Sequence, residues 1–156
     1  MTSEETRKAA MQKALRMLER RDYAAGELVD KLKLKGVEEE DAIKTAERLT
    51  ELGYIDDKRF ASVLVRHYSA KCFGPGKIKS EFIKRRVPRE LWDEALSELP
   101  ESADEIYEML IKKLGSRERN RDNIRKAGAS VVHRGFSWEE VGEAVQRLLY
   151  EEDYEQ

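Results

Sequence analysis

Residues 28–49 read LVDKLKLKGVEEEDAIKTAERL, and this stretch predicts two short helices separated by a tight turn. Apolar residues recur at three-to-four spacing on both sides of Gly36, which is typical of amphipathic helices. A glycine that directly follows Lys35 indicates a helix end, where glycine takes a left-handed conformation after a basic last turn. We expect Val37, the apolar residue after the turn, to pack between the two helices.

The same pattern occurs three times along the chain. The first copy has Leu28, Leu32, Gly36-Val37, Ala42, Ala46 and Leu49; the second has Ile78, Phe82, Arg86-Val87, Trp92, Leu96 and Leu99; the third has Ala127, Val131, Gly135-Phe136, Val141, Val145 and Leu148. A further helical stretch precedes each copy, so the sequence predicts three tandem three-helix repeats of the helix-turn-helix kind. Because about 50 residues make a marginal core, we expect the repeats to stack on one another.

The predicted fold class is all-α, because no run alternates apolar and polar residues over six or more positions. We expect about nine helices, near residues 3–20, 24–35, 38–52, 57–72, 75–86, 88–98, 102–115, 119–134 and 137–152. The predicted domains are 1–56 with an N-terminal extension, 57–100, which is basic, and 101–156 with an acidic tail.

Local start signals support these helices. The Ser/Thr-x-x-Glu pattern of a capping box occurs at Thr2–Glu5, Ser102–Glu105 and Ser137–Glu140. Pro75 and Pro88 stand where a first helical turn accepts proline.

Composition favours a soluble intracellular protein. Charged residues make up 40% of the 156 residues, the mean hydropathy is −0.75, and the longest apolar run is far too short for a membrane span. The single cysteine, Cys72, cannot form an internal disulfide, which favours a reducing compartment. We therefore expect a cytoplasmic protein with no signal peptide and no membrane contact.

Charge is distributed unevenly although the net charge is only −2. Residues 58–89 carry +9 and residues 112–136 carry +6, whereas residues 90–111 carry −8 and residues 137–156 carry −6. Such segregation suits a charged partner, including a nucleoprotein. The alternative is a solvated face that neighbouring acidic helices neutralise. The candidate contact residues are Lys77, Lys79, Lys84, Arg85, Arg86, Arg121, Arg125 and Arg134.

No residue pattern indicates an active site, a metal site or a cofactor site. His67 and His133 lack metal-motif spacing, and Cys72 has no ligand partner at zinc-site spacing. Residues 74–77, Gly-Pro-Gly-Lys, superficially resemble a phosphate-binding loop but lack its full pattern and any preceding strand. We interpret them as a flexible hinge between helices and expect no enzyme.

Several stretches resemble the RecX family. Residues 14–23 and 27–37 resemble its first repeat, and residues 49–61, with Leu-Gly-Tyr-Ile-Asp-Asp-Lys-Arg-Phe-Ala, resemble its most recognisable stretch. Residues 74–82 resemble its basic middle repeat and residues 134–137, with Lys113-Leu114, its third. The similarity spans residues 9–150.

This resemblance implies an elongated, curved array of three three-helix repeats and a cytoplasmic, non-enzymatic regulator of the RecA recombinase. Such a regulator binds the RecA filament on single-stranded DNA, lies in its groove and restrains ATP hydrolysis, filament extension, strand exchange and the SOS co-protease role. The resemblance also implies roles in DNA repair, homologous recombination and the SOS response. We expect a monomer, with single-stranded DNA in or near the filament as a further contact.

Two positions depart from the family pattern. Ala24 stands where a Ser or Thr helix cap is usual, which predicts a helix start weakened by about 1 kcal/mol. Arg86 replaces the turn glycine of the second repeat and predicts a different turn there, since a non-glycine residue resists positive φ. Tyr54, Ile55 and Phe60 are interpreted as a core between helices, with a recognition patch as the alternative.

Two rival functions remain open from the sequence. The first is direct nucleic-acid binding without RecA, although few aromatic residues for base stacking (Tyr68, Phe73 and Phe82 at most) accompany the basic segment. The second is a structural helical adaptor for an unrelated protein.

Overall fold

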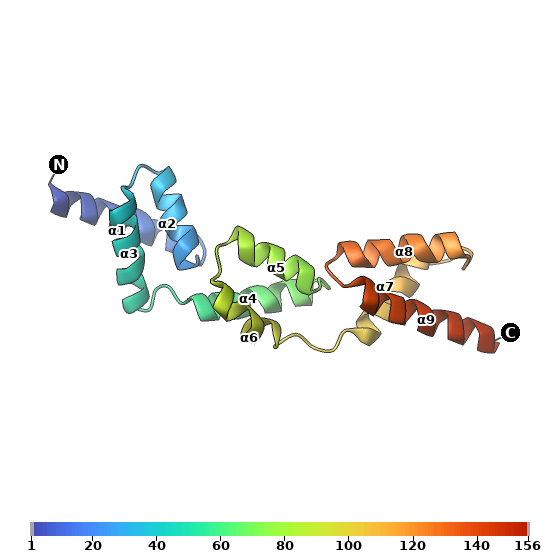
Figure 1. Ribbon diagram of the computed structural model, residues 1–156. Coiled ribbons are helices and arrows are strands. Elements are labelled where there is room, and N and C mark those ends of the chain that lie inside the picture. The colour runs from blue at the N-terminus through green and yellow to red at the C-terminus, as the bar shows by residue number, and fades with distance from the viewer. Residues whose placement is uncertain (1, 156) are drawn as a thin grey trace. The chain divides into compact units, whose positions relative to one another are not determined.

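The computed structural model describes residues 2–155, and this part of the chain contains nine α-helices, one 3₁₀ helix and no strand (Figure 1). The all-α prediction is confirmed. The elements are α1 (Ser3–Arg20), α2 (Ala25–Leu34), α3 (Glu39–Glu51), α4 (Asp57–Ala70), α5 (Pro75–Lys84), η1 (Arg89–Leu91), α6 (Trp92–Leu96), α7 (Ala103–Leu114), α8 (Arg121–His133) and α9 (Trp138–Glu155). None of these helices is long and apolar enough to cross a membrane.

The chain forms two compact units. The first unit contains the described residues up to Leu64 together with Glu81–Ser97. The second contains Val65–Ser80 and the described residues from Glu98 onward. The middle repeat therefore contributes residues to both units.

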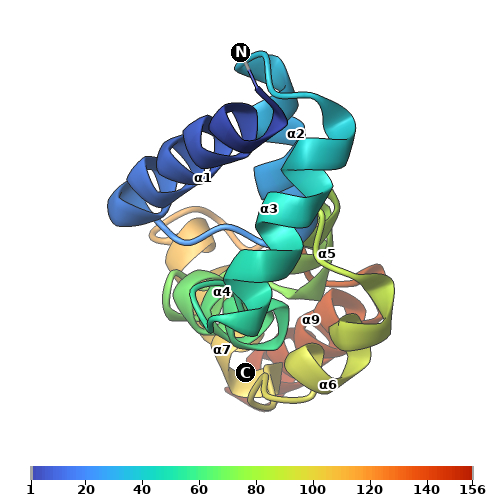
Figure 2. The same cartoon turned by 90° about the vertical axis from the view of Figure 1, so that its left-hand side faces the viewer.

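In the first unit, α1 and α2 both pack against α3 (Figure 2). The apolar positions of the repeat meet in this core, where Leu28, Leu32 and Leu49 are completely buried. Val37 is buried beside them, as the sequence predicts. Burying a leucine side chain completely contributes about 2 kcal/mol relative to leaving it exposed, so this core stabilises the packing of the three helices.

The second unit contains a core of the same design, in which α7 packs against α8 and α9. Ile106, Leu110, Val131 and Leu148 are fully buried there, and Phe136 occupies the position of Val37 after the turn. The apolar positions shared by the first and third repeats are thus core positions in both.

The region predicted as one helix at 88–98 is instead η1 followed by the short α6. Pro88 precedes η1 and is not in the first turn of an α-helix. Trp92 explains the shape of this segment, because its indole Nε1 donates a hydrogen bond of 3.0 Å to the Val87 carbonyl. The Trp92 ring also packs at 5.5 Å from the ring of Phe82, so the segment folds back on the end of α5.

Two of the three predicted capping boxes are present. The Thr2 hydroxyl accepts from the Glu5 amide while the Glu5 carboxylate accepts from the Thr2 amide. Ser137 and Glu140 exchange the same two bonds at the start of α9. The Ser102 prediction is wrong: its hydroxyl instead donates to the Glu140 carboxylate at 2.7 Å, and it makes no cap for α7.

The turn after α5 corrects the prediction made for Arg86. Arg86 adopts φ +58°, in the same left-handed region as Gly36 at φ +91°. The amide of Val87 donates to the Phe82 carbonyl at 2.9 Å, just as the amide of Val37 donates to the Leu32 carbonyl at 3.0 Å. The second repeat therefore keeps the turn of the first without glycine, at a backbone cost of about 1–2 kcal/mol.

The missing cap at Ala24 is replaced by a carboxylate from a distant residue. The Ala25 amide at the start of α2 donates to Asp57 Oδ1 at 2.8 Å, and Asp57 is the first residue of α4. The preceding Asp56 caps its own helix, because its Oδ1 accepts from the Arg59 amide. The two aspartates of the recognisable stretch thus hold the starts of two helices.

The neighbouring residues of that stretch divide between core and surface. Ile55 and Phe60 are buried, as the core interpretation predicts. Tyr54 is 60% exposed, so its assignment to the core is wrong. The left-handed turn at Gly53 carries Tyr54 away from the core while Ile55 enters it.

Residues 74–77 form a hydrogen-bonded junction and not a flexible hinge. Within the second unit, the Gly74 amide donates to the Arg134 carbonyl at 2.9 Å and the Gly76 amide donates to the Gly135 carbonyl at 2.9 Å. A Cβ atom on Gly74 would lie 2.7 Å from the Gly135 oxygen, so only glycine permits this approach. Because the amides at the start of α5 are bonded internally, they are not arranged to hold a phosphate.

Candidate functional site

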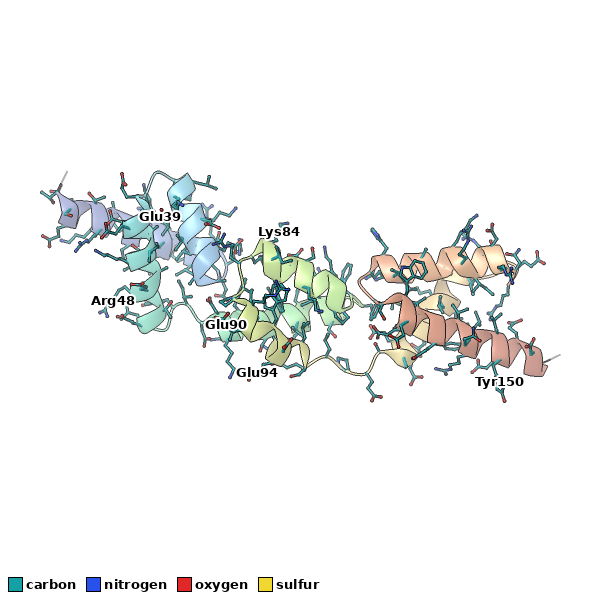
Figure 3. All side chains as sticks on the ribbon, viewed as in Figure 1. Glu39, Arg48, Lys84, Glu90, Glu94 and Tyr150 are labelled. Carbon is teal, nitrogen blue, oxygen red and sulfur yellow. The ribbon has the colours of Figure 1, made fainter. Side chains whose placement is uncertain are left out.

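The predicted contact residues near the end of α5 differ in their exposure and in their ion pairs within the protein. Lys84 is exposed and projects from the last turn of α5 (Figure 3). Arg85 is half-buried, and its Nε lies 3.1 Å from the carboxylate of the buried Glu81. Arg86 lies 3.6 Å from the Asp30 carboxylate of α2. Of these three cations, Lys84 is the one that makes no ion pair with any described residue.

In the second unit, Lys77 and Arg134 pack on aromatic rings. The Lys77 ammonium lies 5.8 Å from the Tyr68 ring and 5.7 Å from the Phe73 ring. The Arg134 guanidinium stacks on Phe73 at 4.2 Å and donates to the carbonyls of Cys72, at 3.0 Å, and Lys71. Arg134 thereby satisfies carbonyl groups that follow the end of α4. Its guanidinium is committed to this internal contact, while its predicted role in partner binding stays a prediction.

The other predicted residues of this unit, Lys79, Arg121 and Arg125, are exposed. Arg125 pairs with Asp122 at 2.9 Å on the surface of α8. Arg121 and Arg125 both border an apolar groove between α8 and α9. Sequence reasoning selected these arginines by charge alone and did not find the groove.

A basic pocket in the first unit was missed entirely by sequence reasoning. It has a volume of about 410 Å³ and lies between α1 and α2. Its lining residues are Lys13, Arg16, Met17, Arg20, Arg21, Tyr23, Lys31 and Lys35. No carboxylate is among them, although the first 57 residues carry a net charge of −3.

The cations of the basic pocket come from one face of α1 and the last turns of α2. Lys13, Arg16 and Arg20 are spaced three and four residues apart, so one helix face presents all three. This spacing was the signal available in the sequence, but intervening acidic residues hid it from a sum of charge by segment. Arg21 is bound to the buried Glu27 by two hydrogen bonds of 3.0 Å and stacks on Tyr23, so it supports the pocket wall.

The aromatic side chains proposed for base stacking are occupied internally. Phe82 is fully buried. Tyr68 and Phe73 meet edge to face at 5.8 Å, beneath the cations of Lys77 and Arg134. A binding mode based on phosphate contacts therefore fits this surface better than base stacking does.

The titratable groups do not form a catalytic constellation in the described residues. A hydrogen bond with Glu105 and burial raise the pKa of the Cys72 thiol, which makes it less nucleophilic. Cys72 also occupies the left-handed position of the turn after α4, with φ +62°. No group of three or more His, Cys, Asp or Glu side chains in the described residues is arranged to hold a metal ion.

Comparisons with known proteins agree with the repeat organisation. Residues 10–49 match the family model for the first three-helix domain of RecX, and residues 56–96 match the model for its second. The regulatory protein RecX of Chlorobaculum tepidum is 34% identical over 151 residues, covering 92% of this chain and 91% of that protein. The regulatory protein RecX of Vibrio campbellii is 31% identical over 134 residues, covering 85% and 86%.

A solved structure supports the fold. The crystal structure of RecX from Lactobacillus salivarius matches with a TM-score of 0.82 at 22% sequence identity, covering 92% of this chain and 97% of that one. At this level of identity, the likeness bears on the fold and not on the binding residues.

Proposed function

Because the chain belongs to the RecX family, we propose that it is a non-enzymatic cytoplasmic regulator of the RecA recombinase. It binds the RecA filament on single-stranded DNA, lies in the groove of the filament and restrains ATP hydrolysis, filament extension, strand exchange and SOS co-protease activity. The observation that carries this proposal is the match of both RecX domains together with relatives that cover nearly the whole chain.

Several separate cationic surfaces support binding by bridging. Lys84 in the first unit and Lys79 and Arg121 in the second are exposed cations available to a partner. If each surface contacts a different RecA subunit, the second contact gains from the effective concentration created by the first. Modest individual contacts are then sufficient for tight binding to a filament and weak binding to a single subunit.

The direct test is a titration of this protein into RecA that is hydrolysing ATP on single-stranded DNA. We expect inhibition at less than one molecule per RecA subunit. Unchanged hydrolysis at saturating concentrations of the folded protein and low salt would refute the proposal.

Contact residues are best tested with variants that leave the internal ion pairs intact. Lys84→Glu is expected to weaken inhibition, whereas Lys113→Glu on α7 gives the same change of charge at another exposed position and serves as the control. Arg85 and Arg86 are poor choices, because reversing either would break its pair with Glu81 or Asp30. If a variant at Arg85 or Arg86 lost inhibition, the result would not distinguish misfolding from the loss of a contact with RecA.

The second candidate function is direct nucleic-acid binding, and the basic pocket favours it. A duplex or single strand laid across this pocket would bring phosphates to Arg16, Arg20 and Lys31. If five phosphates were neutralised on a single strand, the logarithm of affinity would fall against the logarithm of salt with a slope of about −3.5.

Anisotropy of a labelled oligonucleotide, without RecA, measures this slope. Arg20→Glu should weaken binding and make the slope shallower, with Lys113→Glu as the control. Equal affinities for the two variants and the wild-type protein would exclude the basic pocket as the contact.

A further inference from the structure

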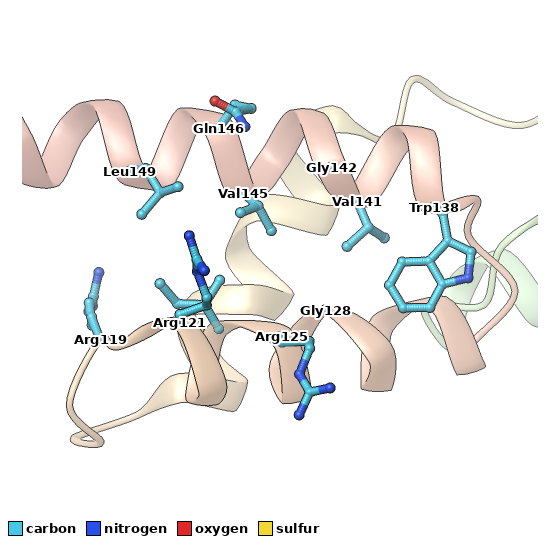
Figure 4. Close-up of a pocket in the computed structure, with 11 residues that line it drawn as sticks. Arg119, Arg121, Arg125, Gly128, Trp138, Val141, Gly142, Val145, Gln146 and Leu149 are labelled. Carbon is cyan, nitrogen blue, oxygen red and sulfur yellow. The ribbon is translucent and has the colours of Figure 1, made fainter.

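The second unit carries an apolar groove of about 520 Å³ between α8 and α9 (Figure 4). Two of its lining residues, Gly128 on α8 and Gly142 on α9, have no side chain to fill it. Val141 and Val145 point from α9 toward α8 across the groove. The Trp138 ring stands at one end and Leu149 lies toward the other.

The exposed apolar side chains of this groove indicate a binding site for a partner. Trp138 is 63% exposed and Leu149 is 40% exposed, although both are large. A contiguous apolar surface of this kind, bordered by charged residues, is typical of a protein interaction site. Trp138 in particular belongs to the residue types that dominate binding energy at interfaces.

The internal repeat provides a comparison within the same chain. The equivalent groove of the first repeat, between α2 and α3, has a volume of about 410 Å³. There Val29 stands at the position of Gly128 and Ile43 at the position of Gly142. Along the groove of the third repeat, glycine thus stands in place of two bulky side chains, whereas Ile124 and Val145 replace Ala25 and Ala46.

The rim of the groove differs in the same comparison. Leu149 takes the place of Thr50, and Arg125 takes the place of Gly26. In the first repeat, Gly26 lies against Arg86, and a Cβ atom on Gly26 would be 3.1 Å from the Arg86 Cβ. In the third repeat the equivalent residue, Arg125, is exposed. This copy of the groove therefore has the larger volume and the larger apolar side chains in its lining.

The charge at the groove selects for acidic groups. Arg119 pairs with Glu152 at 3.1 Å, and the Arg125 side chain points away from α9. Arg121 reaches into the space between the two helices, and among the described residues it makes no ion pair. No carboxylate is among the residues that line the groove. A carboxylate on the occupant would therefore find an available guanidinium that can bind it with two hydrogen bonds.

We propose that this groove binds a short, acidic amphipathic helix of the RecA protein, an inference that rests on the proposed function. From Trp138 to Leu149 the groove runs along α9 for about 16 Å, which matches roughly three turns of a bound helix. Apolar residues at positions i, i+7 and i+11 of that helix contact Trp138, Val145 and Leu149 in turn. An aspartate or glutamate on its flank binds Arg121.

A nucleic acid fits this groove less well. The lining is apolar, and Arg121, the one lining arginine without an ion pair in the part of the chain that the structure describes, would neutralise a single phosphate. Stacking of a base on Trp138 is the competing possibility that the experiment must separate.

The experiment uses the full chain with two groove variants and a control. Gly142→Phe fills the groove, and because nothing lies within 4 Å of a Cβ atom at this position, the helix accepts the substitution. Arg121→Glu reverses the charge at the groove. Arg117→Glu is the matched control, since it makes the same exchange at an exposed residue that does not line the groove.

The readouts are inhibition of RecA ATP hydrolysis and, separately, binding of a free single-stranded oligonucleotide. We expect both groove variants to need about tenfold more protein for inhibition, the loss of one good contact, while Arg117→Glu stays within about twofold of wild type. Oligonucleotide binding by Gly142→Phe should equal that of wild type. If Gly142→Phe inhibits RecA normally, or loses oligonucleotide binding in parallel, the groove proposal is refuted and the proposed function stands. If wild type itself does not inhibit RecA, both proposals fail.

The chemistry of the occupant is read out by crosslinking. A benzoylphenylalanine photocrosslinker at position 146, where an exposed glutamine borders the groove without filling it, is irradiated in the filament complex and analysed by mass spectrometry; it should attach to an acidic RecA segment with apolar residues at helical spacing. Attachment to DNA or to a basic RecA segment, or the absence of any crosslink in an inhibited filament, would overturn the proposal.

Discussion

Adding one methyl group at Gly74 tests the junction between the start of α5 and the turn at Gly135. In Gly74→Ala the new Cβ atom would lie 2.7 Å from the Gly135 oxygen and 2.8 Å from both its carbonyl carbon and Phe136 Cδ1. Ordinary van der Waals contact begins at 3.4 Å, and two of these three atoms belong to the backbone. The clash therefore cannot be relieved by rotating a side chain, and the junction must open.

The expected cost follows from the bonds that depend on this approach. Opening the junction breaks the Gly74 and Gly76 amide bonds, both 2.9 Å, and the Arg134 bond to the Cys72 carbonyl at 3.0 Å. At about 1 kcal/mol for each hydrogen bond, the free energy of unfolding should fall by about 3 kcal/mol. Gly142→Ala is the matched control, because its Cβ meets nothing within 4 Å and alanine raises helix propensity by about 1 kcal/mol.

The assay is urea unfolding followed by far-ultraviolet circular dichroism. Gly74→Ala should lower the free energy of unfolding of the transition to which the second unit contributes, while Gly142→Ala should raise it. If Gly74→Ala is as stable as wild type, the amides of α5 are not held by the Gly135 turn, and the junction described above is wrong.

Two further predictions concern positions where the structure departs from the sequence-based expectation. Arg86→Gly should leave the free energy of unfolding unchanged or slightly higher, whereas the β-branched Arg86→Val should lower it by about 2 kcal/mol, because φ +58° penalises branched side chains; equal stabilities in urea would contradict the left-handed turn. Asp57→Ala should lower the free energy of unfolding by about 1 kcal/mol, because it removes a helix cap. Asp57→Asn keeps an acceptor for the Ala25 amide and should be as stable as wild type. Burial raises the pKa of Asp57 above its ordinary value despite that hydrogen bond, so the folded state binds its proton more tightly and this residue's contribution to stability falls as pH rises between the two values. Asp57→Asn should remove that part of the pH dependence of unfolding, and a profile identical to wild type would show that Asp57 is not the buried group.

The helices could be predicted wherever the signal was local. Helix α1 begins and ends at the predicted residues, because its cap is made by Thr2 and Glu5 within one turn. Ser102 has the same local pattern and fails, since its hydroxyl binds Glu140 from a helix 38 residues away. A capping pattern indicates only that a side chain is able to form the capping hydrogen bond. Whether the side chain makes that bond depends on competing partners that the tertiary fold brings close.

The candidate site was less predictable than the fold for a related reason. Net charge by segment identified Lys84 and Arg121, which are exposed, together with Arg134, which is bonded to backbone carbonyls. Charge alone cannot separate a cation that binds a partner from one that closes a helix end. The basic pocket was missed because a sum along the chain averages over both faces of α1, whereas the pocket uses only the face of Arg16 and Arg20.

The two junctions between repeats follow one rule that explains where glycine is needed. In the first unit, the turn that ends α5 meets the start of α2, where Gly26 leaves room for the Arg86 side chain. In the second unit, the turn that ends α8 meets the start of α5, where Gly76 is the equivalent of Gly26. Here the two backbones are hydrogen-bonded, and a Cβ on Gly135 would lie 2.5 Å from the Lys77 nitrogen. The first junction therefore tolerates an arginine in the turn because its glycine is on the helix, whereas the closer second junction requires glycine on both sides.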